Sequence, residues 1–121
     1  MRPLTIIVTT PDAERLRGAL TLAAAQAALG GGATLFLQLD AVALLRAPVA
    51  APRDGAHRQA GLPSLPMLLA EAQALGVAIV ACQSGLALCG MTLADLPAGI
   101  DAGGPLAILG NAGDDARLLI A

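Results

Sequence analysis

Short runs of β-branched and aliphatic residues alternate along the chain with longer segments in which apolar residues recur every three or four positions. Uncharged runs of this kind are typical of strands that are buried on both faces of a parallel sheet. We predict strands at 4–8, 33–37, 77–81 and 116–120, with 100–102 as either an edge strand or a connector. The alternation predicts an α/β domain with a mainly parallel sheet of about four or five strands, in which 4–8 is central.

Capping residues delimit the predicted helices. After the first strand, Thr10 is placed to cap a helix that has Pro11 in its first position, and Gly30 ends this helix. The triplet Gly30-Gly31-Gly32 follows a helix and precedes a strand, so we interpret it as a turn and not as a phosphate loop. The other predicted helices are 41–46 after Asp40, 65–75 between Ser64 and Gly76, 86–91, and 105–109 before Gly110 and Asn111, with one further turn at 92–96.

The only long irregular stretch runs from Ala47 to Pro63. A loop of this length in a compact domain is usually either functional or mobile. It leaves the second strand–helix unit at the sheet edge that also carries Cys82. Two interpretations follow: a plain disordered loop, or a lid over that thiol with Arg53, His57 and Arg58 as its polar residues.

Cys82 is the residue whose position predicts chemistry. It follows the strand 77–81, and Gln83-Ser84-Gly85 is the predicted turn into the helix 86–91. In an open parallel sheet, reactive groups gather at the carboxyl ends of the strands, next to helix amino termini. Unpaired N–H groups and the helix dipole favour a thiolate there. The candidate residues around the thiol are Gln83, Ser84 and Gly85, with Thr9 and Thr10 after the first strand.

The alternative is that Cys82 is a small buried apolar residue that only packs. Cys89 lies up to seven positions further on, which is about 10 Å along a helix axis. That separation is longer than a disulfide allows. We therefore predict two free thiols and a packing role for Cys89. Unpaired cysteines in a chain without a recognisable secretory signal indicate the cytoplasm.

The composition predicts one domain, 1–121, that associates with copies of itself. A net charge of −2 and 13% charged residues give no indication of nucleic acid or an anionic membrane as partner. The mean hydropathy is +0.73, and the uncharged stretch from Gly76 to Ala94 is long enough to cross a bilayer. Its Gln83, Ser84 and Thr92, and the lack of flanking anchors, argue against a span. Self-association explains the excess of apolar residues better, because exposed apolar patches usually mark interfaces.

No cofactor is predicted. One histidine and two separated cysteines do not make a zinc site, which needs four ligands at recognisable spacing. No Ser-His-Asp set, pair of carboxylates or dinucleotide fingerprint is apparent. Phe36 is the only aromatic residue, which argues against a flavin. We interpret His57 as a solvated loop residue.

Several of these motifs resemble the DsrE/DsrF/DsrH-like family. They are the run from Gly76 to Cys82, then Gly90-Met91, Asp95-Leu96, Gly103-Gly104 and the closing apolar strand, preceded by the strand at 35–37. The resemblance implies a flavodoxin-like three-layer sandwich with strand order 2-1-3-4-5, and oligomeric assembly, here a homo-oligomer (trimer or dimer). It also implies sulfur relay through a persulfide, with Cys82 on the family's reactive cysteine. Where one branch of the family has Met-Ser-Met-Asp, this chain has Ser84-Gly85-Leu86-Ala87, so the polar neighbours of the cysteine are partly missing.

The resulting hypothesis is a small cytoplasmic sulfur carrier or sulfurtransferase. Cys82 accepts sulfane sulfur from a donor protein and passes it to an acceptor thiol, an exchange that needs no metal and no nucleotide. Two alternatives stay open. One is a non-catalytic oligomeric subunit in which Cys82 only packs, and the other is a small-ligand-binding module with a pocket near Thr9 and Cys82.

Overall fold

A five-stranded parallel sheet forms the centre of the molecule. The computed structural model describes residues 1–121, and every strand pairing in it is parallel. The strands are β1 (Leu4–Val8), β2 (Ala33–Leu37), β3 (Ala78–Cys82), β4 (Asp101–Gly103) and β5 (Arg117–Ile120). The predicted strands are confirmed, and the segment near 100–102 is a short edge strand.

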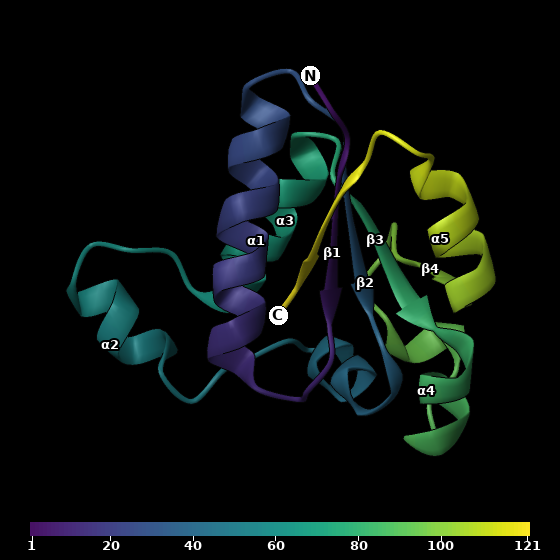
Figure 1. The fold of residues 1–121 in the computed structure, drawn as a ribbon. Helices are drawn as coiled ribbons and strands as arrows, with labels where there is room; N and C mark the ends of the chain where they lie inside the picture. Colours follow the sequence, from purple (N-terminus) through teal and green to yellow (C-terminus); the bar gives the residue numbers. More distant parts are fainter.

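Helices cover both faces of this sheet. They are α1 (Ala13–Ala28), α2 (Asp54–Gln59), α3 (Leu65–Ala74), α4 (Gln83–Leu88) and α5 (Pro105–Ala112), with 3-10 turns η1 (Leu39–Leu45) and η2 (Leu93–Asp95). Figure 1 shows α1 and α3 together on one side of the sheet and α5 on the other. The chain therefore has the predicted α/β, flavodoxin-like three-layer fold.

The strand order differs from the one that the family resemblance implied. The order is β4-β3-β2-β1-β5 and not 2-1-3-4-5. Each of the first three crossovers moves one strand further in the same direction, and the crossover through α5 then returns across the sheet to place β5 beside β1. The central strand is accordingly β2, which corrects the prediction that 4–8 is central. β2 also separates β1 from β3.

The two faces of the sheet are covered to different extents. On the face toward α1, the strand residues Leu4, Ile6 and Val8 are buried, and α1 packs on them with many small alanines. The other face is covered mainly by α5, which buries only Ile108. As a result, five large aliphatic residues of α5 and β5 remain exposed: Leu106, Leu109, Leu118, Leu119 and Ile120.

The first helix begins two residues later than the predicted cap. Asp12, and not Thr10, is the N-cap: its carboxylate accepts the N–H groups of Glu14 at 2.9 Å and Arg15 at 3.3 Å. A carboxylate at this position also complements the helix dipole. Gly30, with a φ of 89°, ends the segment as predicted.

Two further boundaries near the sheet edge differ from the predictions. η1 begins at Leu39, so Asp40 lies inside it and forms no capping hydrogen bond. α4 begins directly at Gln83, so the residues predicted as a turn, Gln83 to Gly85, form the first turn of the helix. No connecting residue therefore lies between β3, which ends at Cys82, and α4, which begins at Gln83.

The remaining differences shorten one predicted helix, lengthen another and add a third. α4 ends at Leu88 and not at Met91. α5 continues through Gly110 and Asn111 to Ala112. The stretch from Ala47 to Pro63 is not irregular throughout, because it contains α2. The cap Ser64 is confirmed: its hydroxyl accepts the N–H of Met67 at 3.4 Å.

The uncharged stretch 76–94 does not form one continuous helix. It is divided among the turn after α3, β3, α4 and η2. None of the helices combines the length and the apolar character that crossing a bilayer requires.

Candidate functional site

Cys82 lies at the carboxyl edge of the sheet, as predicted. It is the last residue of β3 and the residue immediately before α4, and its side chain forms no capping hydrogen bond. Because side chains alternate along a strand, it shares the face of Val80, which lines a pocket together with Ile108 of α5. Only 2% of Cys82 is exposed. In this conformation the thiol belongs to the core, and a second molecule reaches it only if neighbouring residues move.

η1 packs directly against the helix that follows Cys82. A Cβ on Gly85 would collide with the carbonyl oxygen of Leu39 and with the side chain of Val42. Leu39 has a φ of 49°, a left-handed conformation that costs a non-glycine residue about 1–3 kcal/mol. At the other end of α4, the Arg46 guanidinium donates to the carbonyl oxygen of Cys89 at 3.0 Å. Residues 39–46 therefore hold α4 at both of its ends.

The structure brings together only part of the predicted cysteine environment. Gln83 and Ser84 are exposed in the first turn of α4, and Gly85 is buried against η1. Thr9 donates its hydroxyl to the carbonyl oxygen of Ala121 at 2.9 Å, and Thr10 is exposed. Since β2 lies between β1 and β3, Thr9 and Thr10 are two strands away from Cys82 and do not line a pocket with it.

The predicted lid packs against α1 and does not cover Cys82. His57 Nε2 lies 2.7 Å from Glu14 Oε1, and Arg53 Nη1 lies 3.3 Å from the same oxygen. Arg58 is exposed and reaches the sulfur of Met67. Figure 1 shows α2 and α4 at opposite sides of the molecule. His57 is thus a partner of Glu14, which also corrects its interpretation as a solvated residue.

A buried arginine holds this segment in place. The Arg17 guanidinium donates to Glu14 Oε2 at 2.9 Å, to Asp54 Oδ1 at 2.8 Å and to the carbonyl oxygen of Pro63 at 3.3 Å. Its side chain is only 8% exposed. A charge at this depth needs close partners, because the desolvation of an unpaired one is costly. The contacts of Arg17 with Asp54 and Pro63 therefore help to explain why α2, which buries no residue of its own, keeps its position.

This network shifts the pKa values of its three charged groups. Hydrogen bonds from His57 and then from Arg17 hold the pKa of Glu14 below its ordinary value of 4.5. For Asp54, burial raises the pKa, but hydrogen bonds from Arg17 and from two backbone amides outweigh burial and leave it below 3.8. Burial lowers the pKa of Arg17, and its bonds to the two carboxylates more than restore it. All three groups are therefore held in their charged forms.

A groove of about 740 Å³ lies beside this network, between α1 and α3. Leu22, Leu62 and Leu68 supply apolar lining, and Glu71 lies at its rim. The sequence interpretation missed this region. The signal that points to it is Arg17, a charge on the apolar face of the helix between Leu16 and Leu20, where a paired and buried side chain is expected.

No ligand set for a metal accompanies the cysteines. The structure contains no group of three or more His, Cys, Asp or Glu side chains placed to hold a metal ion. Both thiols are free, with Cys82 buried and Cys89 half-buried at the C-cap of α4. Cys82 lines none of the five main pockets. The small-ligand pocket expected near Thr9 and Cys82 is therefore not among them.

The fold is similar to solved structures, although the sequence matches no family model and no curated protein. MTH1491 from Methanobacterium thermoautotrophicum, described as a protein of unknown function, has 17% identity and a TM-score of 0.75. The YchN protein from E. coli has 21% identity and a TM-score of 0.75. Each comparison covers 100% of both chains. These structural neighbours support the three-layer fold, and at such identities the likeness concerns the fold alone.

Proposed function

We propose that this chain is a sulfane-sulfur carrier of the DsrE-like type, with Cys82 as the residue that is loaded. The observation that carries the proposal is the place of Cys82 between the end of β3 and the first residue of α4. That edge of a parallel sheet is where reactive groups usually gather. The motif resemblance around Cys82 supports the same choice of residue. A cytoplasmic location belongs to this proposal.

The proposed exchange is balanced without any further reactant. The Cys82 thiolate attacks the outer sulfur of a donor persulfide, a new sulfur–sulfur bond forms, and the donor leaves as a thiolate with the electron pair of the broken bond. An acceptor thiolate then attacks the outer sulfur on Cys82 and releases Cys82 as a thiolate. No net oxidation or reduction takes place over the two steps.

The burial of Cys82 adds a requirement to this exchange. Cys82 is 2% exposed, so part of its surroundings has to move before a donor approaches. We propose that the moving element is α4, which separates from η1. A six-residue helix is short enough for such an opening, because short helices depend on their packing for stability. When closed, the same packing shields a persulfide from other thiols.

Intact-protein mass spectrometry after exposure to a sulfane-sulfur donor, with and without cyanide, tests the proposal. We expect a gain of one sulfur atom that maps to Cys82 and is removed by cyanide. Cys82→Ser should abolish the gain, and Cys89→Ser, the matched control in the same helix region, should retain it. Loading of Cys82→Ser with retained fold, or no loading of the wild-type chain by any donor, would count against the carrier function.

The second candidate function is a non-catalytic oligomeric subunit in which Cys82 only packs. It is favoured by the burial of Cys82 and by the exposed aliphatic residues of α5 and β5, including Ile120, which is 65% exposed. Uncovered apolar surface of this kind usually marks an interface, and a second copy of the chain, in a dimer or trimer, is the proposed occupant. Alkylation rates separate the two candidates: a subunit without carrier function should leave Cys82 unreactive in the folded assembly while Cys89 reacts.

A further inference from the structure

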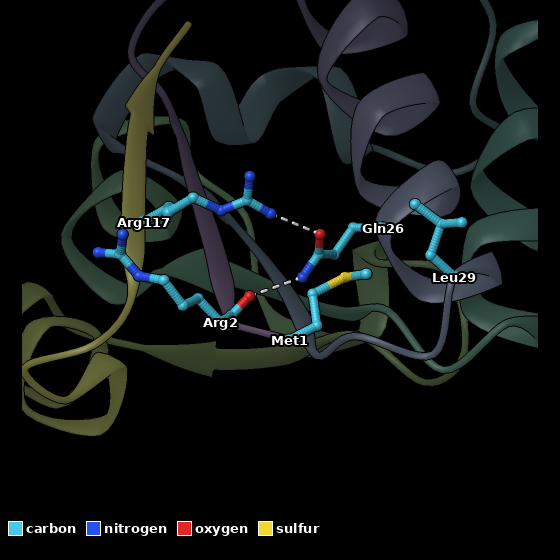
Figure 2. Close-up of a pocket in the computed structure, with 5 residues that line it drawn as sticks. All are labelled: Met1, Arg2, Gln26, Leu29 and Arg117. Carbon is cyan, nitrogen blue, oxygen red and sulfur yellow. Dashed lines mark hydrogen bonds between the residues drawn. The ribbon is translucent and has the colours of Figure 1, made fainter.

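Two arginines line a pocket at the amino edge of the sheet, at the opposite end of the strands from Cys82. The pocket has a volume of about 410 Å³ and is lined by Met1, Arg2, Gln26, Leu29 and Arg117. Figure 2 shows that its residues come from three places: the start of the chain, the end of α1 and the start of β5. None of them belongs to the site proposed for sulfur transfer.

The strand order is what places the two arginines side by side. Arg2 lies just before β1, and Arg117 is the first residue of β5, which pairs with β1 so that Leu4 lies opposite Arg117. The N–H of Arg117 donates to the carbonyl oxygen of Pro3 at 2.8 Å. Residues 115 positions apart in the sequence are therefore neighbours at one edge of the sheet.

A buried amide fixes the geometry of this pocket. Gln26 is 5% exposed, and its Nε2 donates to the carbonyl oxygens of Arg2 at 2.8 Å and Gly32 at 3.3 Å. Its Oε1 accepts from Arg117 Nη2 at 2.7 Å. Figure 2 shows the Arg117 side chain turned toward Gln26, while the Arg2 side chain extends in the other direction, to the start of β5. The position of the Arg117 guanidinium is thus determined by a buried side chain and not left to solvent.

Both guanidinium groups keep most of their donors and have no acidic partner. Arg117 uses one donor on Gln26, and Arg2 uses its Nε on the carbonyl oxygen of Asp115 at 2.7 Å. A guanidinium has five N–H donors. The ion pairs of the structure involve Arg15, Arg17, Arg53 and His57, and none involves Arg2 or Arg117. The nearest acids along the chain, Asp114 and Asp115, are exposed and form no ion pair with either arginine.

We infer that this pocket binds an oxyanion, a carboxylate or a phosphate group carried by a small molecule with an apolar part. Arg117 supplies the fixed donors, and the exposed Arg2 side chain closes on the anion from the side of β5. Planar guanidinium groups bind carboxylate and phosphate through paired hydrogen bonds. Exposed Met1 and Leu29 provide an apolar wall for the rest of the ligand.

Nuclear magnetic resonance titration of the ¹⁵N-labelled chain at constant ionic strength tests this inference. Inorganic phosphate is the probe in one arm and butyrate in the other, and the tighter of the two identifies the anion class. We expect saturable shifts of the amides around Gly32 and Arg117. Arg117→Gln should weaken binding about tenfold or more, because a hydrogen bond to a charged group is lost, and Arg2→Gln should weaken it severalfold.

Arg58→Gln is the matched control, because it removes the same charge from an exposed arginine outside the pocket. It should leave the affinity within about twofold of wild type, since screening removes most of a distant charge's effect. If Arg117→Gln disturbs the fold, Arg2→Gln decides alone, because Arg2 contacts Gln26 only through its main-chain oxygen. An absence of saturable shifts with both anions, or an equal loss in Arg58→Gln, would overturn the assignment.

Discussion

Replacing Gly85 by alanine separates the packing of α4 from its helix propensity. In an isolated helix, replacing glycine by alanine stabilises the helix by about 0.5–1 kcal/mol. Here the added methyl group meets the carbonyl oxygen of Leu39 and the side chain of Val42. Overpacking of a closed contact costs about 1–3 kcal/mol. The carbonyl belongs to a backbone that cannot rotate away, so we take the upper half of that range and expect a net loss of about 1–2 kcal/mol.

Urea unfolding followed by circular dichroism measures this loss. Gly18→Ala is the matched control: Gly18 lies in α1, and a Cβ there has no heavy atom within 4 Å, so it should stabilise by about 0.5–1 kcal/mol. The two substitutions should therefore shift the midpoint in opposite directions. A Gly85→Ala protein at least as stable as wild type would refute the contact between α4 and η1.

The same variant has a consequence for the thiol. A methyl group that pushes α4 away from η1 raises the population of the open conformation, because local opening follows local stability. Alkylation of Cys82 in the folded protein should become faster in Gly85→Ala, while Gly18→Ala should leave it unchanged. Equal alkylation rates in the two variants would show that α4 does not control access to Cys82.

Three further changes test the network and the uncovered face. Arg17→Met leaves Asp54 without its charged partner and should lower the free energy of unfolding by about 2 kcal/mol. This loss is smaller than that for breaking a fully buried ion pair, because the partners of Arg17 are partly solvated. A loss near zero in urea unfolding would contradict the structural role of Arg17. The pKa values of Glu14 and Asp54 are depressed in the folded state. The two carboxylates therefore contribute fully to stability above the ordinary pKa values of 4.5 and 3.8, and this contribution is lost as the pH falls below those values. Asp54→Asn should reduce the fall of the urea midpoint with decreasing pH, and an unchanged pH dependence would contradict the role of Asp54. Ile120→Lys places a charge on the exposed β5, and should shift sedimentation toward the monomer, whereas an unchanged distribution would place any interface elsewhere.

Local sequence patterns are sufficient to predict the strands and most of the helices. Uncharged runs such as 33–37 predict buried strands because burial on both faces leaves no position for a charge. Ser64 and Gly30 mark helix ends because capping depends only on adjacent residues. The α1 cap was misplaced since Thr10 and Asp12 are both good capping residues, and the choice depends on where the chain leaves β1.

The strand order and α2 could not be predicted in the same way. Periodicity shows that a strand is buried, but it does not identify the neighbours of that strand. α2 buries no residue, so it leaves no apolar pattern. Its position depends on ion pairs with α1, that of Asp54 with Arg17 and those of Arg53 and His57 with Glu14. The position of Cys82 at the end of β3 is predicted correctly, but its burial depends on tertiary packing, which the local sequence does not specify.

The pairing of β5 with β1 has a consequence for the order of events in folding. β1 to β4 become neighbours in the order of the chain, so each pairing closes only one crossover. β5 joins β1 across most of the sequence, and the hydrogen bond between Thr9 and Ala121 spans 112 positions. Closing so long a loop costs more entropy than any other pairing. We therefore expect β5 to dock after the folding transition state, so that Leu118→Ala accelerates unfolding and leaves the folding rate nearly unchanged in a chevron measurement.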